Sequence, residues 1–116
     1  MKKRKIGAAS LEVSAIGYGC MGLSHGYGTT PERSEAVALI RKVYELGCNF
    51  FDTAEGYSAG ENEKLVAEGI APIRQDIILA TKFRINPDEE VSTMPRLMEA
   101  VESHLDASLK RLKTDY

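Results

Sequence analysis

The sequence has little of what marks several classes of protein. Its two cysteines, Cys20 and Cys48, form no CxxC pair and have no histidine at ligand spacing, so neither a disulfide framework nor a metal site is predicted. Each lies in an apolar segment, and we expect two buried, reduced thiols in a cytoplasmic protein. No uncharged apolar stretch reaches about 18 residues, the length that a membrane-spanning helix needs, so no membrane association is predicted.

The sequence also has no large excess of positive or negative charge. Lysine and arginine number 15 against 17 aspartates and glutamates, which gives a formal net charge of -2. Binding to nucleic acid would need a basic surplus on one face, so no nucleic-acid partner is predicted. The basic run Lys2–Lys5 leads into small residues rather than an apolar segment, so it is not a secretory signal. We interpret it as a solvated tail.

A repeated alternation of strand and helix is present instead. Three short apolar segments are expected to be strands: Val13–Gly19, Cys48–Phe51 and Asp76–Thr81. The third is apolar and β-branched almost throughout, as a strand covered on both faces would be. Strands that alternate with helices lie parallel in one sheet, joined by right-handed crossovers. The fold class is therefore α/β, and both a doubly wound sheet and a (β/α)₈ barrel begin in this way.

Helices are expected between and after these strands. Thr30 is the predicted N-cap of the first helix, with a proline at its first position, and Gly47 ends it. A short second helix covers Glu61–Gly69, and a third begins near Ser92–Thr93. The apolar positions of the third helix recur at helical spacing: Leu97, Val101, Leu105, Leu109 and Leu112.

A glycine motif after the first strand suggests a dinucleotide-binding turn, but its surroundings disagree. Gly17–Gly22 reads G-x-G-x-x-G, which in a Rossmann domain is followed at once by a helix that cradles the pyrophosphate. Here further glycines follow, and the first credible helix cap is Thr30. The ribose-binding acid, expected about 20 residues further on, would fall near Lys42, and Asp52 comes too late. We interpret the motif as a glycine-lined turn, with the Rossmann module as the alternative.

Three reactive side chains follow the second and third predicted strands. Asp52 ends the second strand, Tyr57 lies further along the same loop, and Lys82 follows the third strand. Taken singly, they are an ordinary cap, a loop aromatic and a solvated charge. Parallel strands end at the same edge of a sheet, so we expect the three side chains to converge there, where a barrel enzyme builds its site.

These residue types suit proton transfer to a carbonyl oxygen. A free tyrosine titrates near about 10 and is a poor acid or base at neutral pH. A lysine ammonium beside it stabilises the phenolate, and a carboxylate holds the lysine in place. Such a tyrosine can protonate a carbonyl oxygen as a hydride reaches the carbon. The hydride must come from a cofactor, because no side chain donates one.

Five segments share the order and spacing of one enzyme family: LEVSAIGYGCMGLS, ELGCNFFDTAEGY, NEKLV, ATKF and ASLKRLKTDY. With these segments the chain resembles the aldo-keto reductases over essentially its whole length. The resemblance implies a (β/α)₈ TIM barrel, NADP(H) as cofactor, and reversible reduction of aldehydes or ketones to alcohols. Because a barrel needs roughly 250 residues, residues 1–116 would be the N-terminal part of one barrel domain, with its first three β/α units.

The same resemblance assigns roles to particular residues. It implies that Tyr57 is the general acid, that Lys82 tunes it, and that Asp52 pairs with the lysine. The loop after the first strand, with Met21 and Gly22, would lie near the nicotinamide ribose, which Asp52 would also reach. The implied partner is a small carbonyl compound, while the substrate itself and the oligomeric state are not defined by these motifs.

Two departures from the family pattern concern histidine and length. The family's catalytic histidine follows the fourth strand, beyond Tyr116, and neither histidine of this chain replaces it. His104 is expected on the surface, in mid-helix and far from the site. His25 is expected to be an ordinary loop residue, with a place in the substrate pocket as the alternative. We expect this chain alone to be inactive; a nucleotide-binding regulatory relative with little turnover is the alternative to an enzyme.

Overall fold

A three-stranded parallel sheet lies at the centre of the chain. Its strands are β3 (Tyr18–Gly19), β4 (Phe50–Asp52) and β5 (Ile78–Ala80), and β4 pairs with the other two. The computed structural model describes every residue except 9, 27, 87 and 90. The parallel arrangement agrees with the prediction from the alternation of strands and helices.

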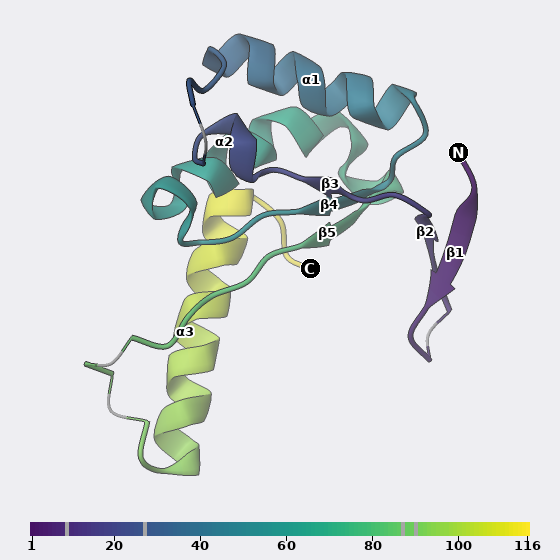
Figure 1. Ribbon diagram of the computed structural model, residues 1–116. Helices are drawn as coiled ribbons and strands as arrows, with labels where there is room; N and C mark the ends of the chain where they lie inside the picture. The colour runs from purple at the N-terminus through teal and green to yellow at the C-terminus, as the bar shows by residue number, and fades with distance from the viewer. Residues whose placement is uncertain (9, 27, 87, 90) are drawn as a thin grey trace.

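The three helices are not distributed evenly around this sheet. Figure 1 shows α1 (Arg33–Glu45) and α2 (Glu61–Ile70) together on one side, while α3 (Met94–Leu112) approaches them only with its C-terminal end. Gly69 lets α1 approach α2 closely, because a Cβ there would lie 2.5 Å from Cδ1 of Ile40. The buried core between sheet and helices is made of Cys20, Leu23, Ala36, Ile40, Phe51, Leu65, Val66, Ile70, Ile77 and Leu112.

Both cysteines are buried and unpaired, as predicted. Burial, with a smaller contribution from the nearby Asp52 carboxylate, raises the pKa of the Cys20 thiol to about 12. The thiol therefore stays protonated near neutral pH and acts as a small apolar core residue. Within the described residues, no helix is long and apolar enough to cross a membrane.

The ends of the helices agree only in part with the prediction. The N-cap of α1 is Glu32, not Thr30, because its carboxylate accepts a bond from the first turn while Glu35 reaches back to the Glu32 N–H, at 3.3 Å. Gly47 ends α1 as predicted, with φ +92°. Thr93 is the N-cap position of α3, also as predicted. After α2, which ends at Ile70 rather than at the predicted Gly69, the chain continues as a 3₁₀ helix, Ala71–Asp76.

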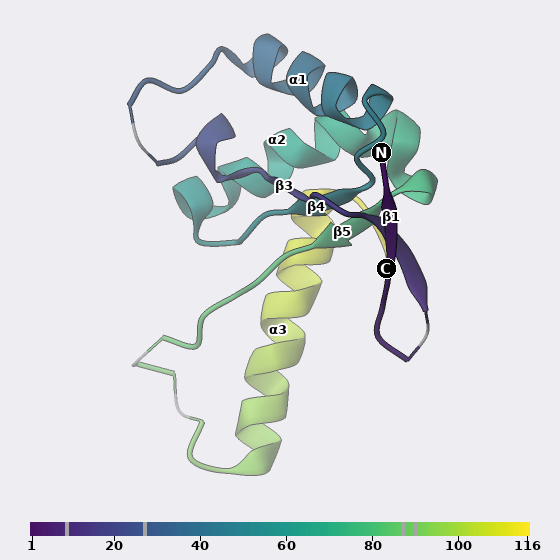
Figure 2. The ribbon, with the colours of Figure 1, turned by 45° about the vertical axis from the view of Figure 1, so that its right-hand side comes forward.

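An antiparallel hairpin precedes the sheet and was not predicted. It pairs β1 (Lys3–Ile6) with β2 (Leu11–Ser14), so the basic run is a strand rather than a solvated tail, and Val13–Gly19 is not one strand. The side chain of Asn49 joins the hairpin to the start of β4: its Oδ1 accepts from the Ser14 N–H at 2.6 Å. Figure 2 shows the hairpin standing at the amino end of the sheet, opposite the edge where the strands finish.

Apolar surface is left exposed on β5 and α3. All three residues of β5 are only partly buried, because β5 is the edge strand of the described sheet; the cover on both faces that its composition predicts is not complete among the described residues. On α3, Met94, Met98 and Leu105 are exposed by 69%, 50% and 49%, and Leu105 is one of the apolar residues that recur at helical spacing. The radius of gyration is 15.3 Å, against about 13 Å for a compact domain of this length.

We predict that the 116-residue chain by itself self-associates through this surface. The double substitution Met98→Lys/Leu105→Lys should raise its monomer fraction, measured by sedimentation velocity, because it replaces exposed apolar area with charge. The control is Ser103→Lys, which adds charge at an exposed position of α3 outside the apolar stripe. A wild-type chain that sediments as a monomer and melts cooperatively would contradict this expectation.

Candidate active site

The carboxyl edge of the sheet brings Asp52 and Lys82 together. Asp52 lies opposite Ala80 in the register of β4 with β5, and the pairing continues beyond the strands: the Glu55 N–H donates to the Lys82 carbonyl at 3.1 Å. The Lys82 ammonium then donates to Asp52 Oδ1 at 2.7 Å and to the Thr53 carbonyl at 2.9 Å. About half of each side chain is exposed, 51% for Lys82 and 47% for Asp52. The Lys82 ammonium is therefore held by two hydrogen bonds while half of its side chain stays accessible to solvent.

Tyr57 completes the predicted group. Its ring centroid lies 4.8 Å from Lys82 Nζ, within the range of a cation–π contact. Tyr57 starts a short 3₁₀ segment, Tyr57–Gly60, in which Ser58 and Ala59 have φ of 50° and 52°. Non-glycine residues adopt this left-handed conformation at a cost of the order of 1–3 kcal/mol each. The backbone thus turns back sharply, so that the tyrosine stays at the sheet edge while α2 begins directly behind it.

The three side chains share one electrostatic environment. Partial burial by itself would lower the pKa of the Lys82 ammonium, but its bonds to Asp52 and its interaction with the Tyr57 hydroxyl outweigh this and raise the pKa. Lys82 is therefore positively charged near neutral pH. The charged ammonium is therefore fixed between the Asp52 carboxylate and the Tyr57 ring.

The first loop closes the same edge from the side of β3. The Cys20 N–H donates to the Asp52 carbonyl at 2.8 Å, so Met21 and Gly22 follow directly beside Asp52. Met21–Leu23 is a single 3₁₀ turn, and the first α-helix starts only at residue 33, which supports the glycine-lined turn over the Rossmann motif. His25 stacks on Tyr57, with 5.9 Å between ring centroids and 13° between planes. The structure therefore places His25 at the site, although it is exposed.

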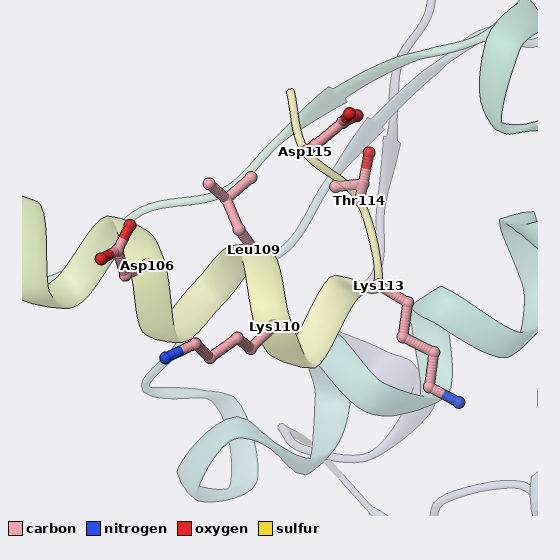
Figure 3. A pocket seen from close by; sticks show the side chains of 6 residues that line it. All are labelled: Asp106, Leu109, Lys110, Lys113, Thr114 and Asp115. Atoms are coloured by element: carbon pink, nitrogen blue, oxygen red, sulfur yellow. The ribbon is translucent and has the colours of Figure 1, made fainter.

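A hollow adjoins this edge. It has a volume of about 340 Å³ and is lined by Ala54, Glu55, Gly56, Lys82, Phe83, Arg84 and Asn86. A larger hollow of about 630 Å³ lies against the C-terminal end of α3, where Lys110 and Lys113 point away from the tail that carries Thr114 and Asp115 (Figure 3). That second hollow contains none of the predicted site residues. The hollow beside Lys82 is the one positioned for chemistry.

His104 is not the surface residue that was predicted. Only 15% of its side chain is exposed. Its Nδ1 lies 2.9 Å from Glu55 Oε2 and its Nε2 lies 3.0 Å from Glu89 Oε1, while the ring stacks on Phe83 at 4.9 Å. The prediction failed because mid-helix position alone does not show that α3 passes beneath the loops that follow β4 and β5. His104 therefore contacts Phe83, which is the residue directly after Lys82.

Two further buried polar residues escaped the sequence analysis. Asn62 and Glu63, in the first turn of α2, are both 0% exposed. A carboxylate in the first helical turn reads as an ordinary favourable dipole contact, which is why nothing in the sequence singled out Glu63. Its partner Arg111 lies on α3, with Nε 2.5 Å from Glu63 Oε2. The pair joins α2 to α3 through two residues that are 48 positions apart in the sequence.

Comparison with known proteins agrees with this geometry. A sequence profile described as the Aldo/keto reductase family matches residues 15–116. The oxidoreductase YqkF of Bacillus subtilis is 40% identical over an alignment of 118 positions, which covers 100% of this chain and 37% of YqkF. An aldo-keto reductase of Bacillus halodurans, solved in its holo form, is 41% identical with a TM-score of 0.74, covering 100% of this chain and 38% of its own.

A second similar structure was solved as a complex with its ligands. It is an aldo/keto reductase of Klebsiella pneumoniae in complex with NADP and acetate, 30% identical with a TM-score of 0.70, matched over 93% of this chain and 34% of its own. A parallel β/α sheet with polar residues at its carboxyl edge defines an α/β protein, and the matched structures distinguish a barrel from a doubly wound sheet. The chain belongs to the aldo/keto reductase family, and its three β/α units correspond to part of the family's TIM barrel.

We predict that the His104 imidazole titrates above its ordinary value. Its hydrogen bond to Glu55 is the main cause of the raised pKa, helped by Glu89 and opposed by burial. The charged contacts therefore stabilise the fold fully at pH below the ordinary histidine pKa, and this contribution disappears as the pH rises through the raised value. NMR titration of a complete protein that contains this chain measures the shift.

Glu55→Gln should lower the His104 pKa more than Glu89→Gln, because Glu55 is the larger cause. Glu102→Gln, at an exposed position two residues before His104, is the matched control and should leave it unchanged. A His104 pKa that is ordinary or low in the parent protein would show that the cluster does not hold a charged imidazole.

Proposed function

We propose that this chain supplies the proton-donating edge of an NADP(H)-dependent reductase that interconverts aldehydes or ketones with alcohols. Residues 1–116 would be the N-terminal part of one barrel domain, with its first three β/α units. The observation that carries the proposal is the position of Lys82, which bonds to Asp52 at 2.7 Å and faces the Tyr57 ring at 4.8 Å. Family membership supports the reaction class.

In this proposal Tyr57 is the general acid. Its hydroxyl gives a proton to the carbonyl oxygen of the substrate, while Lys82 stabilises the negative charge that remains on the phenolate. Asp52 and the Thr53 carbonyl hold the Lys82 ammonium in that place. In the oxidation direction the same phenolate would accept the proton of the alcohol, so the reaction is reversible without a second set of residues.

The first loop fits one end of a nicotinamide cofactor. A Cβ built on Gly22 would have no atom within 4 Å, so backbone there is open to a ligand. Met21 stands beside it, partly buried, and the Asp52 carboxylate is half-exposed and able to accept a bond from a ribose hydroxyl. When bound, the cofactor would supply the hydride that reduces the carbonyl carbon. NADP in the Klebsiella pneumoniae relative supports the choice of cofactor.

We predict that Tyr57→Phe nearly abolishes turnover in the complete protein. Loss of the proton donor should lower kcat by roughly 10²–10⁴-fold, while binding of NADPH, followed by its fluorescence, stays intact. Reduction of 4-nitrobenzaldehyde by NADPH measures kcat. Tyr44→Phe is the matched control, because it removes a hydroxyl from a partly buried tyrosine of α1, outside the site.

Near-normal turnover in Tyr57→Phe would remove the proposed general acid. A wild-type protein that binds NADPH but reduces no carbonyl compound would instead favour a nucleotide-binding regulatory protein over an enzyme.

We also predict that the 116-residue chain on its own has no reductase activity. It spans 37% of the length of YqkF, and a barrel needs roughly 250 residues to close around its substrate. NADPH consumption with 4-nitrobenzaldehyde, assayed with the purified chain, should equal the rate without protein. Saturable consumption that is lost in Tyr57→Phe would contradict the prediction.

A further inference from the structure

The first turn of α2 places two polar side chains inside the core. Asn62 and Glu63 are 0% exposed, and Glu63 is a carboxylate. Burial of a charge costs several kcal/mol unless hydrogen bonds and an opposite charge compensate for it. An apolar residue of similar volume would fill the same space at less cost. What these two side chains bond to therefore indicates why polar groups stand there.

Asn62 joins the ends of two strands. Its Oδ1 accepts from the Thr53 hydroxyl at 2.7 Å. Its Nδ2 donates to the Cys20 carbonyl at 2.9 Å and to Ser24 Oγ at 2.7 Å. Thr53 directly follows Asp52, and Cys20 directly follows β3. The amide thus holds the chain just beyond β4 against the chain just beyond β3.

Glu63 does the same for the third strand. Its Oε1 accepts from the Thr81 hydroxyl at 2.7 Å, and its Oε2 accepts from Arg111 Nε on α3. Arg111 is itself oriented by Ser108 Oγ, 3.1 Å from its Nη2. Thr81 directly precedes Lys82. The buried Glu63 carboxylate, paired with Arg111, is therefore bonded to the residue directly before Lys82.

The two contacts converge on one ammonium group. Thr53 is held by Asn62 through its side chain, and its carbonyl accepts from Lys82 Nζ at 2.9 Å. Lys82 follows Thr81, which is held by Glu63. Consecutive residues of one helix thus set both the origin of the lysine side chain and one of its acceptors. Among the described hydrogen bonds, neither Asn62 nor Glu63 bonds directly to Tyr57 or Lys82.

We propose that Asn62 and Glu63 are positioning residues for the site, acting through the hydroxyls of Thr53 and Thr81 on Asp52 and Lys82. The proposal rests on the proposed reductase function, because it concerns the geometry of that site. A positioning role differs from a packing role because it requires particular hydrogen bonds. Shape alone is not sufficient; the two hydroxyl groups must be present.

The test uses isosteric substitutions in the complete protein. Thr81→Val keeps the side-chain shape and removes the hydroxyl that bonds to Glu63, while Thr81→Ser keeps the hydroxyl. We expect kcat for 4-nitrobenzaldehyde to fall about tenfold or more in Thr81→Val, with KM for NADPH nearly unchanged, because small misplacements of a reacting group cost up to about 10²-fold. Thr81→Ser should recover most of the loss. The pair Thr53→Val and Thr53→Ser tests Asn62 in the same way.

Glu63→Gln, compared with Glu61→Gln, tests the carboxylate. Glu61 lies in the same turn but is exposed and pairs with Lys64, so its substitution should leave kcat at the wild-type value. A purely structural role for Glu63 and Thr81 predicts a lower melting temperature with kcat per folded molecule unchanged. That result in Thr81→Val would overturn the proposal.

A second readout does not depend on turnover. The Lys82 ammonium, followed by ¹³C NMR of labelled lysines and assigned with Lys82→Met, should titrate at lower pH in Thr81→Val than in Thr81→Ser, because the displaced lysine loses part of its contact with Asp52. Equal titration in the two variants would overturn the proposal. If the wild-type protein reduces no carbonyl compound, the proposed function fails, and this titration alone decides whether Glu63 positions Lys82.

Discussion

The parallel pairing of β4 with β5 is the constraint on which the site depends. It sets Asp52 opposite Ala80 and continues beyond both strands to the bond between Glu55 and Lys82. The Lys82 side chain can then reach back across the sheet edge to Asp52, and the sharp turn at Ser58 and Ala59 returns Tyr57 to the same edge. A shift of one residue in the register would turn alternate side chains to the other face of the sheet, so the meeting of a lysine, a carboxylate and a phenol follows from the backbone.

Much of this geometry is readable from the sequence, because it follows from the rule that parallel strands end at one edge. The positions of Asp52, Tyr57 and Lys82 needed only the order of strands and helices. The hairpin was missed because Lys3–Ile6 is exposed along its whole length and lacks an apolar signal. The N-cap was misplaced because a carboxylate at Glu32 forms a capping box as well as a threonine would. His104 and Glu63 depend on where α3 passes relative to α2, which local patterns do not contain.

The exposed apolar surface of this chain is consistent with its partial coverage of the related proteins. The chain spans 37% of YqkF and 38% of the Bacillus halodurans structure, and its edge strand β5 and the outer stripe of α3 are left uncovered in the described part of the molecule. The core between sheet, α1 and α2 is nevertheless well formed, and Arg111 ties α3 to it through Glu63. The elements that surround Lys82 therefore belong to the part of the chain that has a buried core.

The central claim is that the Lys82 ammonium makes Tyr57 an effective proton donor, and substitution of the lysine tests it most directly. Carbonyl reduction by NADPH should be compared between Lys82→Met and Lys64→Met in the complete protein, since Lys64 is an exposed lysine of α2 that pairs only with Glu61 among the described ion pairs. We expect Lys82→Met to lose about 10²-fold or more in kcat while it still binds NADPH, and Lys64→Met to match the wild type. Turnover of Lys82→Met close to that of the wild type would contradict the role assigned to the Asp52, Tyr57 and Lys82 group.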